Sequence, residues 1–191
     1  MQDGYVQCKL IERAFYCFEQ IHVEGHSPNV VTFICILKAC GNEGAVEIGK
    51  AVHAKIIYSN LENENLISKA LIDMYSKCGM IAEAQGLFHT FSSRDLVTWH
   101  ILITGYSQLG KDEIVFMLFQ QMINHGEEPN LATLAILLTT CIHTGLLEEG
   151  QLCLDVLRRV YGIIPSLEHL TCMIDLFSRA GCLDKAIMLI K

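Results

Sequence analysis

Apolar residues recur at three- and four-residue spacing along most of this 191-residue chain, and a glycine ends the pattern at five places. Residues three and four apart share one face of an α-helix. The glycines are separated by 35, 31, 35 and 36 residues: they are Gly44, Gly79, Gly110, Gly145 and Gly181. A period in this range is typical of stacked helical hairpins, each of which buries its apolar face only against its neighbours. The pattern therefore predicts an all-α fold built from such hairpins.

One unit shows how the pattern predicts a hairpin. Its first helix carries an apolar stripe: Val97, Trp99, Leu102, Ile103 and Tyr106. Gly110 follows, where a left-handed residue closes a helix without a clash from a Cβ atom. The second helix carries another apolar set: Val115, Leu118, Phe119 and Met122. The same register divides the chain into hairpins over 30–64, 65–95, 96–130, 131–166 and 167–191, after an incomplete one over 1–29.

Small residues recur one turn into the second helix, where they would let neighbouring helices approach closely. This place holds Ala14, Gly49, Ala84, Val115, Gly150 and Ala186. The three prolines all fall at turns that we expect between hairpins: they are Pro28, Pro129 and Pro165. Because proline interrupts helices, this placement suits an all-helical fold.

Composition excludes several classes of protein. The chain is 51% hydrophobic with a mean hydropathy of +0.34, so it is not disordered. No uninterrupted apolar run is long enough to cross a membrane. The nine cysteines are odd in number and include no C-x-x-C pair. We therefore expect small buried hydrophobes, such as Cys40 and Cys141, rather than disulfides or a zinc site. The start of the chain has neither a signal-peptide nor a transit-peptide pattern, so no targeting segment is expected in it.

Several long strings carry a family resemblance. They are Val31-Thr32-Phe33, Leu37-Lys38-Ala39-Cys40, Ala70-Leu71-Ile72-Asp73-Met74-Tyr75-Ser76-Lys77-Cys78-Gly79 and Arg94-Asp95-Leu96-Val97-Thr98-Trp99. They resemble plant pentatricopeptide repeat proteins of the subclass that mixes standard, long and short repeats. The resemblance implies a single right-handed α-solenoid over residues 1–191. Within it, 30–64 and 131–166 are long repeats, 65–95 a short one and 96–130 a standard one. The partial units are standard (1–29) and short (167–191). The chain is thus expected to be truncated at both ends and to lack the subclass's deaminase-like domain.

The resemblance also implies a way of binding single-stranded RNA, in which side chains of one repeat contact one base. In the family, the fifth and last residues of a repeat contact the base edge, and the second residue sandwiches the base. The base-reading residues implied here are Asn29, Lys69, Asp95, His100, Asn130 and Thr171, with Leu66 and Val97 as sandwich residues. The family normally has Asn, Thr or Ser where this chain has Lys69 and His100. Their donor and acceptor geometry differs, so we expect weakened specificity.

The net charge of −7 counts against phosphate binding, which normally needs a basic surface. Net charge describes the whole surface, however, whereas RNA contacts only part of it. Lys38, Lys77 and Arg179 lie near the ends of first helices, where they would face phosphates. Many acidic residues begin second helices, a place that suits the helix dipole.

Three functions remain open at this point. The first, implied by the resemblance, is a monomeric module for single-stranded RNA in a mitochondrion or chloroplast. It would act in C-to-U editing or RNA processing by recruiting other proteins. The alternatives are a helical scaffold for protein partners and a truncated remnant without function. The sequence offers no catalytic set, metal cluster or cofactor motif, so an enzyme is not expected. His22-Val23-Glu24 matches the H-x-E of zinc deaminases only by chance, because no paired cysteines accompany it.

Overall fold

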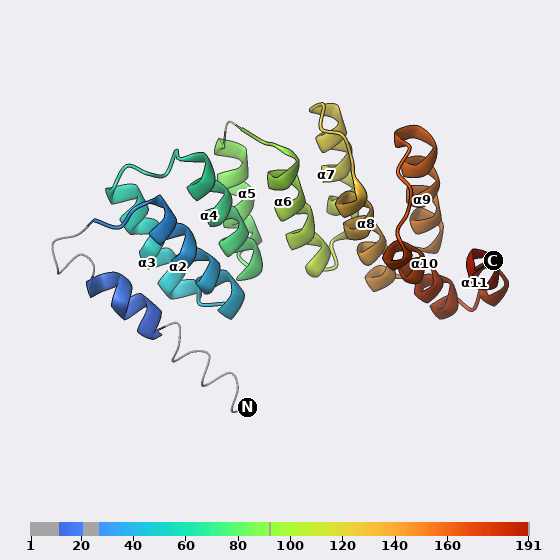
Figure 1. Cartoon of the computed structure of the whole chain (residues 1–191), viewed down its shortest axis with the longest axis horizontal. Coiled ribbons are helices and arrows are strands. Elements are labelled where there is room, and N and C mark those ends of the chain that lie inside the picture. Colours follow the sequence, from blue (N-terminus) through green and yellow to red (C-terminus); the bar gives the residue numbers. More distant parts are fainter. Residues whose placement is uncertain (1–11, 21–26, 92, 191) are drawn as a thin grey trace. The chain divides into compact units, whose positions relative to one another are not determined.

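The structure, a computed structural model, describes residues 12–20, 27–91 and 93–190 (Figure 1). Every regular element in these ranges is an α-helix, which confirms the all-α prediction. The chain divides into two compact units, Met1–Arg94 and Asp95–Lys191. That the repeats form a single array of long, short and standard units stays a prediction.

The first unit contains a helix over residues 12–20 followed by two helical hairpins. Its labelled helices are α2 (Val30–Glu43), α3 (Val46–Tyr58), α4 (Asn65–Lys77) and α5 (Ile81–Thr90). Helix α2 packs against α3, its hairpin partner, and also against α4, the first helix of the next hairpin. Each hairpin therefore buries its apolar face partly against its neighbour, as expected for stacked repeats.

The second unit contains three hairpins. Their helices are α6 (Leu96–Gln108), α7 (Asp112–Asn124), α8 (Leu131–Thr144), α9 (Leu147–Tyr161), α10 (Leu167–Arg179) and α11 (Leu183–Ile190). The first helices again stack in sequence, α6 on α8 and α8 on α10. Pro28, Pro129 and Pro165 lie in the links before first helices, which confirms their expected place.

The five periodic glycines close the first helices in a common way. Each has a positive φ between 64° and 75°, in the left-handed region that favours glycine. The residue after each glycine donates its backbone N–H to the carbonyl five residues earlier, as Lys111 does to Tyr106 at 3.1 Å. This is the hydrogen bond of a Schellman motif. A Cβ atom at any of these glycines would meet nothing within 4 Å, so the φ angle alone explains them.

The small residues of the second helices confirm the expected close approach at two places. A Cβ atom on Gly49 of α3 would lie 2.6 Å from the Met74 sulfur on α4. A Cβ atom on Gly150 of α9 would lie 2.7 Å from Leu176 Cδ2 on α10 and 3.3 Å from Cys141 Cβ on α8. At both places, a second helix is pressed against the first helix of the following hairpin.

The core contains most of the residues that the apolar pattern predicts. Trp99, Leu102 and Ile103 are buried, as are Cys40 and Cys141. Burial raises the pKa of the Cys40 thiol to about 11 and that of Cys141 to about 12, so both stay protonated. The eight cysteines within the described ranges are all free.

Two residues of the apolar pattern differ from expectation. Val97 belongs to the apolar stripe by spacing, but it is 57% exposed. Phe119 is only half-buried, and with Phe116 and Leu157 it lines a hollow of about 290 Å³ between α7 and α9. Apolar spacing places a residue on a helix face but does not tell how far the neighbouring helix covers that face.

Replacing Gly150 with alanine should destabilise the second unit. The substitution gains about 1 kcal/mol in helix propensity but costs about 1–3 kcal/mol through overpacking. The overpacking is not easily relieved, because Cys141 Cβ is attached directly to the α8 backbone and cannot move aside. Thermal unfolding of Gly150→Ala should show a lower midpoint than wild type.

The matched control is Gly86→Ala. Gly86 lies within α5, and a Cβ atom there would meet nothing within 4 Å. Only the propensity gain applies, so this variant should raise the midpoint. A rise for both variants would contradict the proposed tight contact at Gly150.

Candidate nucleic-acid interface

The expected base-reading residues at the ends of repeats are helix N-caps. The side-chain oxygen of Asn29 accepts from the Thr32 backbone N–H at 3.0 Å, that of Asp95 from Thr98 at 3.1 Å, and that of Asn130 from Thr133 at 3.1 Å. In each case, the oxygen also accepts the hydroxyl of the same threonine. Such caps satisfy backbone N–H groups that the first helical turn leaves unpaired. These three residues therefore have a structural role whether or not they contact RNA.

Capping uses the side-chain oxygens of Asn29 and Asn130, so their side-chain nitrogens take no part in the cap. Within the described part of the chain, neither nitrogen has a hydrogen-bond partner, and both residues are exposed. The group that each presents to solvent is therefore a hydrogen-bond donor.

His100 and Asn130, the pair expected to contact one base, are joined through a third residue. His100 Nε2 lies 2.8 Å from the Thr133 hydroxyl oxygen. The same oxygen accepts the backbone N–H of Asn130 at 3.0 Å. Burial lowers the pKa of His100 below its ordinary value of 6.5, so the ring is neutral at pH 7.

The expected sandwich residues are exposed on the first turn of their helices. Leu66 on α4 is 61% exposed and Val97 on α6 is 57% exposed. Val31, at the same place on α2, is 66% exposed. An apolar side chain at this place is consistently left in water, although the next residue along is buried or half-buried. This surface is available for a planar apolar ligand.

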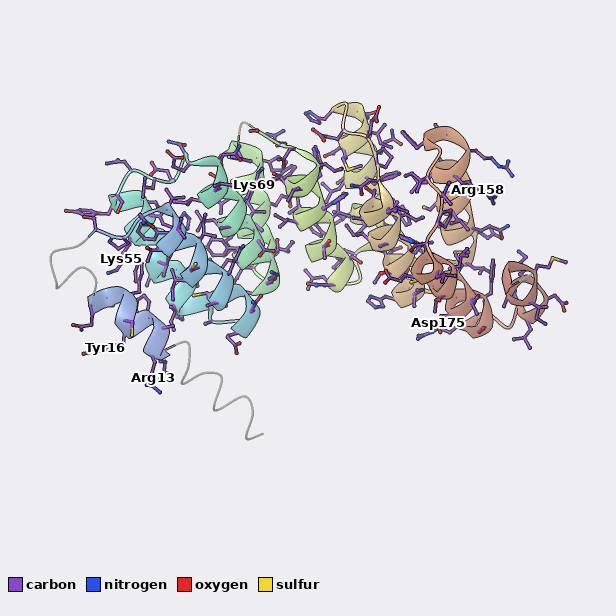
Figure 2. The ribbon with its side chains drawn as sticks, viewed as in Figure 1. Arg13, Tyr16, Lys55, Lys69, Arg158 and Asp175 are labelled. Carbon is purple, nitrogen blue, oxygen red and sulfur yellow. The ribbon has the colours of Figure 1, made fainter. Side chains whose placement is uncertain are left out.

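The fifth-place residues are less uniform. Lys69 is half-buried on α4 (Figure 2). Thr171 on α10 is exposed, and its hydroxyl donates to the Leu167 carbonyl at 2.8 Å. A threonine hydroxyl has one proton, so Thr171 presents an acceptor to solvent.

Two of the three cations expected at phosphates are already paired. Lys77 lies 2.8 Å from Asp73, and Arg179 lies 2.9 Å from Asp175, which Figure 2 labels on α10. Both acids precede the cation by one helical turn. Lys38 is exposed and has no ion-pair partner among the described residues. The acids expected at the starts of second helices are there: Glu47, Glu113, Glu148, Glu149 and Asp184.

Thr133 is the residue of this region that sequence analysis missed. Its signal was present, because a threonine three residues after an asparagine is a capping pattern. The same place on α10 holds His169, whose Nδ1 contacts Ser166 and whose Nε2 lies 2.9 Å from the Leu131 carbonyl.

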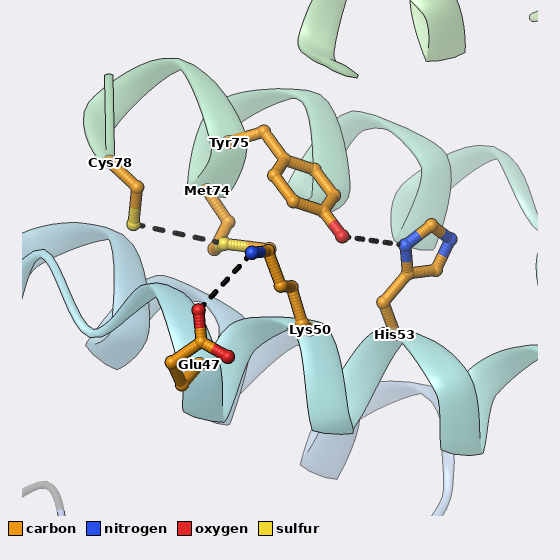
Figure 3. Close-up of polar contacts among 6 residues, drawn as sticks. All are labelled: Glu47, Lys50, His53, Met74, Tyr75 and Cys78. Carbon is orange, nitrogen blue, oxygen red and sulfur yellow. Dashed lines mark hydrogen bonds and ion pairs between the residues drawn. The ribbon is translucent and has the colours of Figure 1, made fainter. Parts of the chain in front are cut away.

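A second half-buried histidine lies outside the expected interface. His53 Nδ1 on α3 is 2.9 Å from the Tyr75 hydroxyl on α4 (Figure 3). Burial lowers the pKa of His53, and the nearby Glu62 carboxylate partly opposes this. Burial also raises the pKa of Tyr75, so both rings are neutral at pH 7. Figure 3 shows the Lys50–Glu47 ion pair on the same helix, 3.1 Å long.

The described residues contain no group of three or more side chains placed to hold a metal ion. No helix among them is both long and apolar enough to cross a bilayer. The H-x-E match at residues 22–24 lies outside the described ranges.

Comparison with known sequences places these hairpins in a known class. The profile of the PPR repeat family matches residues 94–143, that of the pentatricopeptide repeat domain residues 3–43, and that of the PPR repeat residues 68–96 and 168–191. The Arabidopsis thaliana pentatricopeptide repeat-containing protein At4g30700 is 39% identical over the whole chain. The mitochondrial protein At4g19191 of the same plant is 36% identical over the whole chain. The chain spans 24% and 29% of these two relatives.

Solved structures show the same fold. The PPR10 protein, crystallised with an 18-nt psaJ RNA element, superposes with a TM-score of 0.79 at 19% identity, over 97% of this chain and 29% of PPR10. The A. thaliana nuclear proteinaceous RNase P 2 superposes with a TM-score of 0.65 at 13% identity, over 86% of this chain and 38% of that protein. The fold is thus an α-solenoid of helical hairpins. The chain belongs to the pentatricopeptide repeat family.

Acid should destabilise the second unit partly through His100. Its pKa is lowered in the folded state, so below about pH 6.5 the unfolded chain binds more protons than the folded one. Stability is therefore complete above that pH and is lost as the pH falls through the lowered pKa. The drop in unfolding midpoint between about pH 7.5 and about pH 5.5 should be smaller in His100→Gln than in wild type.

The matched control is His143→Gln, because His143 is exposed near the end of α8 in the same unit. It should not reduce the acid sensitivity. Equal acid sensitivity of wild type and His100→Gln would contradict the effect of burial on His100.

Proposed function

We propose that this chain is a module that binds single-stranded RNA along the first turns of its first helices. The observation that carries the proposal is the exposed apolar residue at the second place of each of three first helices, Val31, Leu66 and Val97. Each lies two residues after the N-cap residue of its helix, which is Asn29, Glu64 or Asp95. Apolar contact with a base face, together with polar groups at its edge, is how helical repeats bind unstacked bases. PPR10, which shares the fold, was crystallised with RNA.

The polar groups beside these residues support contact with base edges. Asn29 and Asn130 present amide donors, and Thr171 presents a hydroxyl acceptor. None of these groups is charged, so each can distinguish donors from acceptors on a base without a large desolvation cost. Well-placed contacts of this kind contribute about 1–3 kcal/mol per base.

The electrostatics favour modest affinity that is sensitive to salt. The chain has a net charge of −7, and Lys77 and Arg179 are each paired with a carboxylate. Binding of RNA phosphates must therefore compete with these ion pairs. Ion pairs at exposed sites are weak, about 0.3–0.5 kcal/mol at this helical spacing, so the competition does not prevent binding.

We further propose that the module acts in RNA editing or processing in a mitochondrion or chloroplast, by recruiting enzymes that other chains supply. Two of the related proteins are described as mitochondrial and one as chloroplastic. The relatives are several times longer than this chain, so recruitment is attributed to the whole protein.

A gel-shift series with random-sequence single-stranded RNA tests the proposal. The wild-type chain should shift RNA at low salt and lose affinity as salt increases. Val97→Glu should bind about tenfold more weakly, because it replaces an apolar contact with a charge that repels phosphate. Its fold should be retained, since Val97 is exposed and an acid suits the first turn of a helix.

The control for this variant is Met117→Glu. Met117 is 47% exposed on α7, a second helix outside the proposed surface. It introduces the same charge but should leave affinity nearly unchanged. If folded wild-type chain shifts no RNA at low salt, the proposal is wrong. The apolar hollow between α7 and α9 would then favour the alternative of a scaffold for protein partners.

Releasing Lys77 from its ion pair should strengthen RNA binding. Asp73→Asn removes a negative charge and frees the ammonium group for a phosphate. We expect tighter binding at low salt by a few fold, and a slope of log affinity against log salt that is steeper by roughly 0.7. Fluorescence anisotropy over a salt series measures both.

Glu47→Gln provides the control, because it breaks the Lys50–Glu47 pair on α3, a second helix, with the same change of charge. A general effect of net charge would strengthen binding equally in both variants. That result would remove Lys77 from the proposed interface.

A further inference from the structure

The Thr133 side chain occupies an unusual position within the proposed interface. It is the third residue of α8 and is 1% exposed. Its hydroxyl oxygen lies 2.8 Å from His100 Nε2, 3.0 Å from the Asn130 backbone nitrogen and 3.3 Å from the Asn130 side-chain oxygen. One hydroxyl therefore contacts both residues that are expected to bind a single base, although they belong to different helices or links.

Hydrogen-bond accounting limits what these groups can present to a ligand. A hydroxyl has one proton and two lone pairs, and the Asn130 backbone N–H occupies one lone pair. The remaining lone pair and the proton serve His100 and the Asn130 oxygen. An amide oxygen can only accept, so the proton goes to Asn130 and His100 donates from Nε2 to the remaining lone pair. Its Nδ1 is left as an acceptor for a base. The Asn130 oxygen is held by the cap, so the amide nitrogen is left.

The alignment of α6 with α8 places His100 opposite Thr133. A second hydrogen bond, from the Thr140 hydroxyl to the Ser107 hydroxyl at 2.7 Å, joins α8 to α6 seven residues further along both helices. Both of its side chains are buried. The pair of bonds fixes how α8 lies against α6. His100 is thus held facing Thr133 by the packing of the helices as well as by its own hydrogen bond.

The next pair of first helices lacks the arrangement. On α8, the fifth place is Ala135, which has no polar group to orient. On α10, the third place is His169, which contacts Ser166 and the backbone carbonyl of Leu131. The histidine still completes a cap, but it contacts no side chain at the fifth place. Capping alone therefore does not require the contact that Thr133 makes with His100.

We propose that Thr133 is a positioning residue that sets base specificity: its hydroxyl holds His100 and Asn130 so that they contact a base as one rigid pair. The proposal rests on the proposed RNA-binding function. It assigns discrimination at one nucleotide to a residue that is buried and does not itself touch the base. Without the hydroxyl, the His100 ring loses its hydrogen bond and the Asn130 side chain keeps only its bond from the Thr133 backbone N–H, so the pair is held less firmly and accepts more bases.

Binding of the wild-type chain and three variants to a random single-stranded RNA library, with sequencing of the bound fraction, tests this. Thr133→Val has nearly the same shape but no hydroxyl. It should reduce base discrimination at one nucleotide by roughly five- to tenfold, the lower end of the range for one well-placed polar pair, and leave the preference at other nucleotides unchanged. Thr133→Ser retains the hydroxyl and should retain the preference.

Thr140→Val is the matched control, because it removes the other α6–α8 hydrogen bond, far from the expected base-contacting residues. Both valine variants should lower the unfolding midpoint, but only Thr133→Val should change the base preference. The same base preference in Thr133→Val as in wild type, or the same change in both valine variants, would overturn the inference. Wild-type binding without preference at any nucleotide would also overturn it and leave RNA binding intact. Absence of wild-type binding at low salt would instead refute the proposed function.

Discussion

The structure depends on the stacking of first helices from successive hairpins. A helical hairpin of this size cannot bury its apolar face alone, so within each unit the first helices pack against one another: α2 against α4, α6 against α8 and α8 against α10. The spacing of the contact is the same in both units. Gly41 on α2 approaches Met74 on α4, and Ser107 on α6 bonds to Thr140 on α8, each 33 residues further along the chain. In the first unit, glycine lets the two backbones approach closely; in the second, two side chains form a hydrogen bond. Different chemistry therefore aligns the first helices at the same position of the repeat.

This stacking leaves the first turns of the first helices as a distinct surface. The middle and the end of each first helix are covered by neighbours, but the second residue remains in water, as Leu66 and Val97 do. The caps lie beside it because a helix must satisfy its first N–H groups where it begins. An exposed apolar residue and a capping side chain thus occur together at the start of α2 and of α6, as Val31 with Asn29 and Val97 with Asp95. The fold alone therefore provides the combination of apolar contact and hydrogen-bonding groups that the proposed RNA binding uses.

The sequence predicted the fold well because its signals are local. A glycine with positive φ ends each first helix, and glycine also stands at positions 49 and 150, where two helices approach too closely for a Cβ atom. Both requirements are visible in the sequence as glycines at regular spacing. The candidate site was predicted less completely. Asn130 was expected as a base contact, and its capping role was missed, because the same amide serves either purpose. The contact between His100 and Thr133 joins residues 33 apart, and only the packing of α6 on α8 reveals it.

The proposed double role of the caps, in helix capping and in base contact, constrains how specificity could change in such a chain. An asparagine at a cap must keep its oxygen toward the helix, so it can offer a base only its amide donor. Rotating the amide to offer the oxygen would leave the Thr133 N–H unpaired, which costs about 1–3 kcal/mol. That cost is as large as the gain from one well-placed base contact, about 1–3 kcal/mol. A change in what Asn130 offers to a base therefore requires a change of residue, either at the cap or at the partner that holds it. At this cap, helix stability and the proposed base contact are altered together.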